Sequence, residues 1–251
     1  MDSLILPKWP FILGLLALGA CFALCLVPLY RRRARLGQVL LDPARALHFS
    51  QPDWFGPFCM AWVAALPLAA LQGQYAVQRL VGALANAPTG PQVSVLILGA
   101  LFGLVFYAGI YLGTWLIRTT LIWLLARASG GRAPFAVLLT TVGYASVPEY
   151  LLGTLVMAAA TTFQFSPLAA SPTVLITSLA AFWPQLAATV PGVGVFLEEI
   201  ELFALWSLVL TIIGTQGVFN FSRWQAAAVV LVYWLAALLA SAYFTLAVAQ
   251  A

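Results

Sequence analysis

The chain has 251 residues, of which 63% are hydrophobic and only 7% are charged. A soluble domain normally carries about a quarter of its residues charged, so this composition excludes a soluble globular protein. The net charge of +4 does not indicate a nucleic-acid-binding protein, because the basic residues lie in short segments beside apolar runs. Long apolar runs of this kind predict an all-α fold, a polytopic transmembrane helical bundle in a lipid bilayer.

Residues 9–30 form the first apolar run, which as a helix is about 33 Å long and crosses a bilayer. The basic segment 31–35 follows and is expected on the cytoplasmic side. Residues 18–21 imitate a lipoprotein cleavage box, but the apolar run continues beyond them, so an uncleaved anchor is favoured over cleavage. We therefore divide the chain into an N-terminal anchor, residues 1–35, and one membrane domain, residues 36–251.

Apolar and polar residues are mixed at helical spacing within residues 36–52. This pattern predicts an amphipathic helix on the inner leaflet, which either docks a cytoplasmic partner or is simply a solvated surface helix. The chain's single histidine, His48, lies here without a second histidine or a cysteine nearby. The three cysteines all lie in apolar runs without CxxC spacing, so we expect neither a metal site nor a cofactor.

Five further spans are predicted, and with the first they make six. They cover about residues 55–71, 93–125, 134–161, 195–218 and 225–248. The proline-rich segment 173–190 is only marginally long enough to span, and we interpret it as re-entrant or interfacial. A full crossing there would reverse the orientation of everything after it. In the six-span layout most arginines fall on one side, which predicts that both termini lie outside. The Ala-, Leu- and Arg-rich composition is typical of a bacterial protein, so we expect a bacterial inner membrane protein.

The third span carries four glycines that share one helix face: Gly99, Gly103, Gly109 and Gly113. Small residues spaced in this way let two membrane helices approach closely. The pattern predicts packing against another helix of the chain or against a membrane-protein partner, a second copy included.

Glu149 is the most informative charge, because it lies at membrane depth in the fourth span, just after Pro148. An ionisable group at that depth indicates an ion ligand or a proton carrier. Two structural interpretations compete with this one. The carboxyl is kept neutral by its burial, or it pairs with Arg79 of the second span.

Three more carboxylates open the fifth span: Glu198, Glu199 and Glu201. Acidic residues in the first turns of a helix are favoured by the helix dipole. Alternatively, with Glu149 they form an outward-facing acidic vestibule for cations. A glutamate pair also occurs in intramembrane prenyl-peptide proteases, but Phe203 stands here where those enzymes have an arginine, and no membrane histidine exists. We therefore expect no catalytic residue and no enzyme activity.

Two short motifs resemble a known family. The first comprises Asp53, Trp54, Phe55, Gly56 and Pro57, and it is similar to the Asp-Leu-Tyr-Gly-Pro signature that opens the first core helix of the Yip domain, a family of Ypt/Rab-interacting membrane proteins. The second, Gly143 with Tyr144, looks like the family's Gly-Tyr motif. Residues 200–207 and 213–214 look like the acidic-x-Phe-x-x-Trp-Ser run and the glycine of bacterial members. The resemblance covers about residues 36–248.

The resemblance implies a five-helix core, preceded here by one additional span. It also implies a membrane organiser that forms complexes with related proteins. Two function classes therefore stay open. The first, which we favour, is a non-enzymatic scaffold or accessory subunit that uses the surface around residues 31–57. The second is a transporter or channel with a cation- or proton-coupled site at Glu149 and the outer glutamates.

Overall fold

The structure is a computed structural model that describes part of the chain. It describes residues 27, 30–31, 33–47, 49, 51–66, 89–156, 178, 197 and 200–249. Most of the predicted anchor and of the predicted re-entrant segment lies outside these residues, as do Arg79, Glu198 and Glu199.

The described residues are almost entirely helical, and an antiparallel bridge between Ser178 and Glu201 is isolated rather than part of a named strand. The elements are α2 (Arg33–Leu41), α3 (Pro43–Ala46), a helix over Phe55–Leu66, α5 (Thr89–Ala128), α6 (Phe135–Ala145), the π-helix η1 (Pro148–Gly153), α11 (Leu202–Phe219) and α12 (Arg223–Ala249). The all-α prediction is confirmed.

Four stretches of the described chain are long and apolar enough to cross a membrane. They are Leu101–Ala128, Phe135–Val156, Leu202–Phe219 and Arg223–Phe244. Their outer faces expose large apolar side chains such as Phe106, Val232 and Leu239, which suit contact with lipid tails. The chain is thus an integral, multi-pass membrane protein. The six-span count stays a prediction, since the expected second span is described only over Phe55–Leu66.

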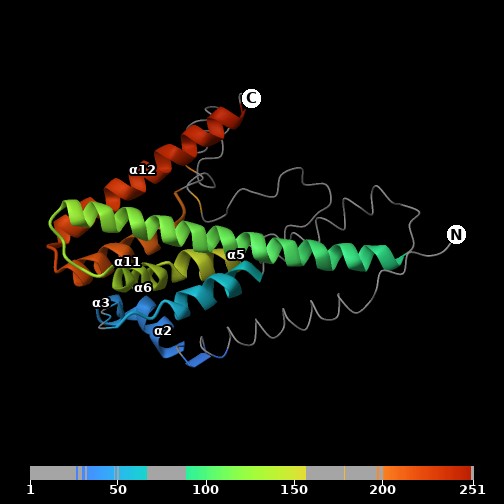
Figure 1. The fold of residues 1–251 in the computed structure, drawn as a ribbon, viewed down its shortest axis with the longest axis horizontal. Helices are drawn as coiled ribbons and strands as arrows, with labels where there is room; N and C mark the ends of the chain where they lie inside the picture. Colours follow the sequence, from blue (N-terminus) through green and yellow to red (C-terminus); the bar gives the residue numbers. More distant parts are fainter. Residues whose placement is uncertain are drawn as a thin grey trace.

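The α5–α6 loop and the α11–α12 turn lie at the same end of the bundle, beside α3 (Figure 1). At the end of α5, Gly130 has a φ of +88°, a left-handed conformation that glycine adopts without a Cβ penalty, and the Gly131 N–H donates to the Ala126 carbonyl at 2.8 Å. At the end of α11, Asn220 takes a similar conformation with a φ of 53°. Both helices therefore end in tight, hydrogen-bonded caps.

The predicted amphipathic segment is two short helices, α2 and α3. Their buried apolar residues include Val39 and Leu47, which pack with Tyr144 of α6 and Leu210 of α11. Leu41, by contrast, is 88% exposed. The buried face of the segment thus packs on the helical bundle instead of facing the leaflet, and it covers one end of α6.

Several buried hydroxyl groups in the bundle donate hydrogen bonds within their own helices, although the hydroxyl oxygens of Tyr150, Ser207 and Thr215 have no hydrogen-bond partner among the described residues. Thr140 and Thr141 of α6 donate to the carbonyls of Ala136 and Val137 at 3.0 and 2.9 Å. Thr119 of α5 and Thr211 of α11 make the same bond to the carbonyl four residues earlier. Because a hydrocarbon environment offers no competing water, these bonds let polar residues face the helix contacts.

Candidate functional site

The two motif stretches meet at the start of the Phe55–Leu66 helix. The Tyr144 phenol donates a hydrogen bond to Asp53 Oδ2 at 2.9 Å, and the Asp53 backbone N–H donates to Thr140 Oγ1 at 2.9 Å. Tyr144 is fully buried, and the Asp53 side chain is 18% exposed. These contacts fix the chain entry against α6, and we call the set Asp53, Pro57, Thr140, Gly143 and Tyr144 the motif junction.

Position 143 has no room for a side chain, because Pro57 and Trp115 lie very close to the Gly143 backbone. A Cβ at this position would lie 2.6 Å from Pro57 Cγ and 2.9 Å from Trp115 Nε1, distances that real Cβ atoms do not show. The Trp115 indole is itself fixed, since its N–H donates to the Leu139 carbonyl at 2.9 Å. Three helices therefore converge on one residue without a side chain.

The first motif has an exposed half and a buried half. Trp54 and Phe55 are exposed and pack edge to face with their ring centroids 5.9 Å apart, whereas Gly56 and Pro57 are buried. The aromatic half is available for contacts outside the described chain. The buried half positions the helix.

The α2–α3 segment completes the motif junction from outside. Phe49 stacks on the Tyr144 ring with centroids 5.2 Å apart, and the Arg35 guanidinium lies 5.3 Å from the Phe49 ring centroid. Arg35 Nη1 is also 3.6 Å from Asp53 Oδ2. Through Asp53 and Phe49 the basic end of α2 is thus tied to the core motif.

Glu149 forms a bidentate ion pair with Arg118 of α5. The two N–O distances are 2.8 and 3.0 Å, and Arg118 Nη1 also reaches Ser146 Oγ at 3.3 Å. The side chains are only 16% and 23% exposed. At about 1.5 Å per residue, Arg118 lies roughly 15 Å along α5 from Ala128, so the pair lies at membrane depth.

Pro148 helps to explain the local geometry of Glu149. Proline has no backbone N–H to donate, and the regular α-helix ends at Ala145 and resumes as the π-helix η1 from Pro148. A π-helical turn changes the register of the side chains that follow it. Glu149 lies in the first turn of η1, from which it reaches Arg118.

The described partner of Glu149 is therefore Arg118, and Arg79, the partner named from the sequence, lies outside the described residues. Sequence reasoning missed Arg118 because it lies inside one long apolar run. A signal was present, since an arginine within a span needs a partner at similar depth.

The position of Glu201 also differs from the prediction. Its backbone is extended, with a φ of −105° and a ψ of 144°, and it precedes α11 instead of lying in its first turn. The bridge to Ser178 holds it in this conformation. Its Oε1 atom would lie 3.7 Å from a Cβ on Gly153, which ends η1. Glu201 thus lies close to the end of the short helix that contains Glu149, while Glu198 and Glu199 fall outside the described residues.

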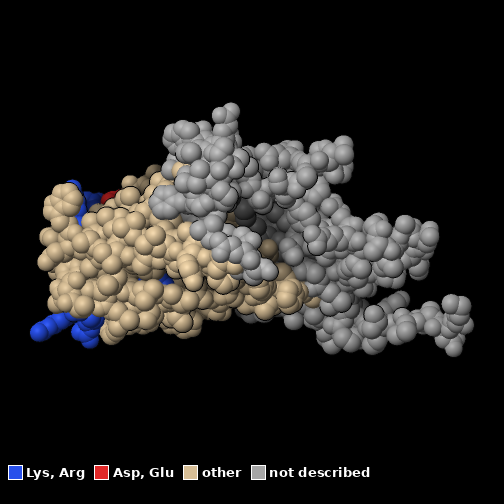
Figure 2. Space-filling model, turned by 90° about the horizontal axis from the view of Figure 1, so that it is seen from above, with Lys and Arg blue, Asp and Glu red and all other residues tan. Residues whose placement is uncertain are grey.

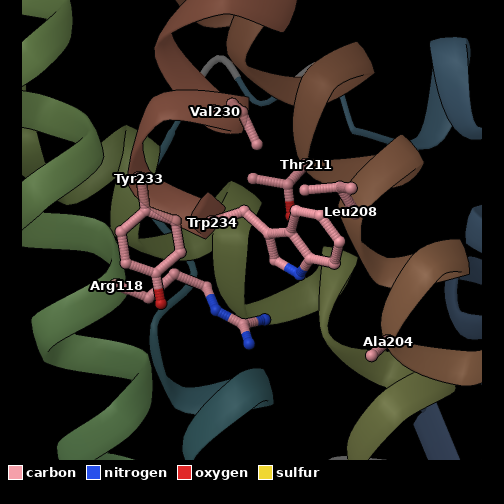
Figure 3. A pocket seen from close by; sticks show the side chains of 7 residues that line it. All are labelled: Arg118, Ala204, Leu208, Thr211, Val230, Tyr233 and Trp234. Carbon is pink, nitrogen blue, oxygen red and sulfur yellow. The ribbon is translucent and has the colours of Figure 1, made fainter. Parts of the chain in front are cut away.

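A small cavity of about 20 Å³ adjoins Arg118, between α5, α11 and α12 (Figure 3). It is lined by Arg118, Ala204, Leu208, Thr211, Val230, Tyr233 and Trp234. A cavity of this volume has room for about one water molecule. Among the described residues, no group of three or more His, Cys, Asp or Glu side chains lies close enough to hold a metal ion.

The glycines of the third span face different surroundings. Gly103 is buried, whereas Gly109 is exposed and Gly113 is half-buried. A Cβ at Gly109 or Gly113 would meet no atom of the described residues within 4 Å. This part of the α5 face is therefore open with respect to the described residues.

Comparison with models of known protein families identifies the family of this chain. The model of the Yip1 domain matches residues 37–244. The chain belongs to the Yip1 domain family. Comparisons with curated proteins and with solved structures find no significant match.

The resemblance inferred from the two short motifs is thereby confirmed. In this Yip1 domain the motifs, distant in sequence, form one structural unit, because Tyr144 bonds to Asp53 and Gly143 accommodates Pro57. The match begins within α2, at residue 37, and includes α3 and Phe49, whose ring stacks on Tyr144 of the second motif.

Proposed function

We propose that this Yip1 domain protein is a non-enzymatic membrane scaffold or accessory subunit that organises other membrane components. The observation that carries the proposal is the Arg118–Glu149 pair. Both groups are engaged with each other at 2.8 and 3.0 Å, which neutralises the most deeply placed carboxylate of the described chain. A paired carboxylate supports a structural role in holding α5 against η1.

The surface for a partner lies around residues 36–58, at the end of the bundle that carries the motif junction. Leu41 and Trp54 project there, exposed by 88% and 54%. Since Asp53 is fixed to Tyr144, the neighbouring aromatic side chains are presented from a rigid base. A rigid base lowers the entropy cost of binding.

A second copy of the chain is the proposed partner for the open face of α5. Gly109 and Gly113 are four residues apart on that helix, and nothing described fills the space above either one. Small residues at this spacing allow close helix contact, which drives association in membranes by packing.

The alternative function is a transporter or channel with a cation- or proton-coupled site at Glu149 and the outer glutamates. The ion pair at membrane depth is the feature that favours it, because such groups mark ion pathways in many transporters. Two features argue against this alternative. Glu149 is already paired with Arg118, and the cavity beside Arg118 has room for only about one water molecule.

One experiment compares the two functions in reconstituted vesicles and in cells. A photoreactive amino acid replaces Trp54, and a matched control replaces Tyr243, which is 76% exposed on α12. The scaffold proposal expects a discrete cross-linked partner from position 54 and none from position 243. It also expects proton and cation flux through vesicles to be the same for the wild type and Glu149→Gln.

Two results would overturn the proposal. One is a flux in the wild type that Glu149→Gln changes while cross-linking at position 54 persists. The other is the absence of any cross-linked protein or second copy from positions throughout residues 36–58.

A further inference from the structure

The loop between α5 and α6 and the turn between α11 and α12 form one surface. A Cβ on Gly131 would lie 2.6 Å from Phe219 Cδ1 and 2.7 Å from Phe221 Cζ, so the two connections touch. Phe219 and Phe221 stack with centroids 5.3 Å apart. We call residues 127–134 and 219–224 together the paired-turn surface.

Three arginines of the paired-turn surface are exposed and lack an ion-pair partner among the described residues. They are Arg127, Arg132 and Arg223. Arg35, Arg45 and Arg118, in contrast, each contact a carboxylate. On the face drawn in Figure 2, the Lys and Arg side chains of the described residues lie mainly at this end. The surface thus carries uncompensated positive charge.

Helix stability explains only one of these arginines. Arg127 lies in the last turn of α5, where the helix dipole favours a cation, and its guanidinium lies 5.0 Å from the Trp123 ring centroid. Arg223 begins α12, where the dipole disfavours a cation. The N-terminus of α12 is already capped by two hydrogen bonds. The Ser222 backbone N–H donates to Gln225 Oε1 at 3.0 Å, and the Gln225 backbone N–H donates to Ser222 Oγ at 3.2 Å. Arg223 is therefore not needed to cap α12, and Arg132 lies outside both helices, in the loop between α5 and α6.

The paired-turn surface lies at the boundary of a bilayer. Each of the four candidate spans either begins or ends at one of its two connections. Trp224, next to Arg223, is 82% exposed. Exposed tryptophan beside the end of a span is typical of the headgroup layer.

We infer that the paired-turn surface binds the headgroup phosphate of anionic phospholipids, with Arg132 and Arg223 as its phosphate ligands. A guanidinium matches a phosphate with two parallel hydrogen bonds. Anionic lipids are preferred over zwitterionic ones because no described carboxylate forms an ion pair with these arginines. The exposed Trp224 beside Arg223 is the kind of side chain that lies in the headgroup layer. An acidic protein segment is the competing occupant.

Native mass spectrometry of the full chain in detergent tests the inference. Phosphatidylglycerol and phosphatidylcholine are titrated separately, and the apparent Kd of each bound lipid is measured. The wild type is expected to bind phosphatidylglycerol more tightly than phosphatidylcholine. The double variant Arg132→Gln, Arg223→Gln is expected to weaken phosphatidylglycerol binding by about fivefold for each arginine removed. The matched control is Arg45→Gln, which removes an exposed arginine that already contacts Asp42 at 3.5 Å.

Equal affinity of the wild type for the two lipids would overturn the inference, as would an equal loss in the Arg45→Gln control. Displacement of the lipid by glycerol 3-phosphate at equal concentration would instead indicate a free-phosphate site and also contradict it. The Arg132→Lys, Arg223→Lys variant keeps the charge and tests the phosphate geometry if the glutamine variant is unstable. It is expected to retain the preference for phosphatidylglycerol with reduced affinity.

Discussion

Tyr144 and Asp53 lie 91 positions apart, and the phenol of the first donates to the carboxylate of the second at 2.9 Å. Each belongs to one of the two motifs of the Yip1 domain. Their bond joins the two motifs at the entry of the Phe55–Leu66 helix, where it satisfies the buried Tyr144 phenol and adds to the Arg35 contact of Asp53. The motif junction is thus a structural lock between two helices.

Tyr144→Phe is expected to reduce the free energy of unfolding by about 1.5–3 kcal/mol, because it removes a hydrogen bond to a charged acceptor. Titration of the purified protein from mild detergent into denaturing detergent measures this change. Tyr243→Phe is the control, since Tyr243 is largely exposed on α12. Similar losses in the two variants would contradict the role of the bond.

Gly143→Ala is expected to destabilise the protein by about 1–3 kcal/mol, since the added methyl group overlaps Pro57 and Trp115. Gly109→Ala is the matched control on α5, where the space is open and alanine is the better helix former. It is expected to leave the unfolding free energy unchanged or slightly raised. A stable Gly143→Ala protein would show that the helices separate at little cost.

Arg118→Gln or Glu149→Gln alone is expected to cost about 3–5 kcal/mol, because each leaves a charge buried without its partner. The double variant is expected to be more stable than the sum of the single effects predicts. A double-mutant cycle on the unfolding free energy measures this coupling. Strict additivity would show that the pair contributes nothing specific.

Asn220 ends α11 with a φ of 53°, where glycine costs least and alanine is strained. Asn220→Ala is therefore expected to be less stable than Asn220→Gly by about 1–2 kcal/mol. Thermal unfolding of both variants, followed by the loss of helical circular dichroism, compares them. Indistinguishable midpoints would mean that the turn relaxes to another conformation.

The membrane class, the helical fold and the family were determined by the sequence itself. Apolar runs that alternate with basic segments are a one-dimensional signal, because the bilayer imposes length and composition on each span separately. The break at Pro148 was also predictable, since proline removes a hydrogen bond within its own helix.

Which residues meet was decided only by the tertiary structure. The structure pairs Glu149 with Arg118, which the sequence did not single out, and the apolar face of α2 and α3 packs on Tyr144 and Leu210 rather than on lipid. A hydrophobic face is equally compatible with lipid and with protein, so its pattern does not choose between them. Pairing depends on how helices rotate and approach, as Gly143 against Pro57 illustrates, and that information is not contained in any single span.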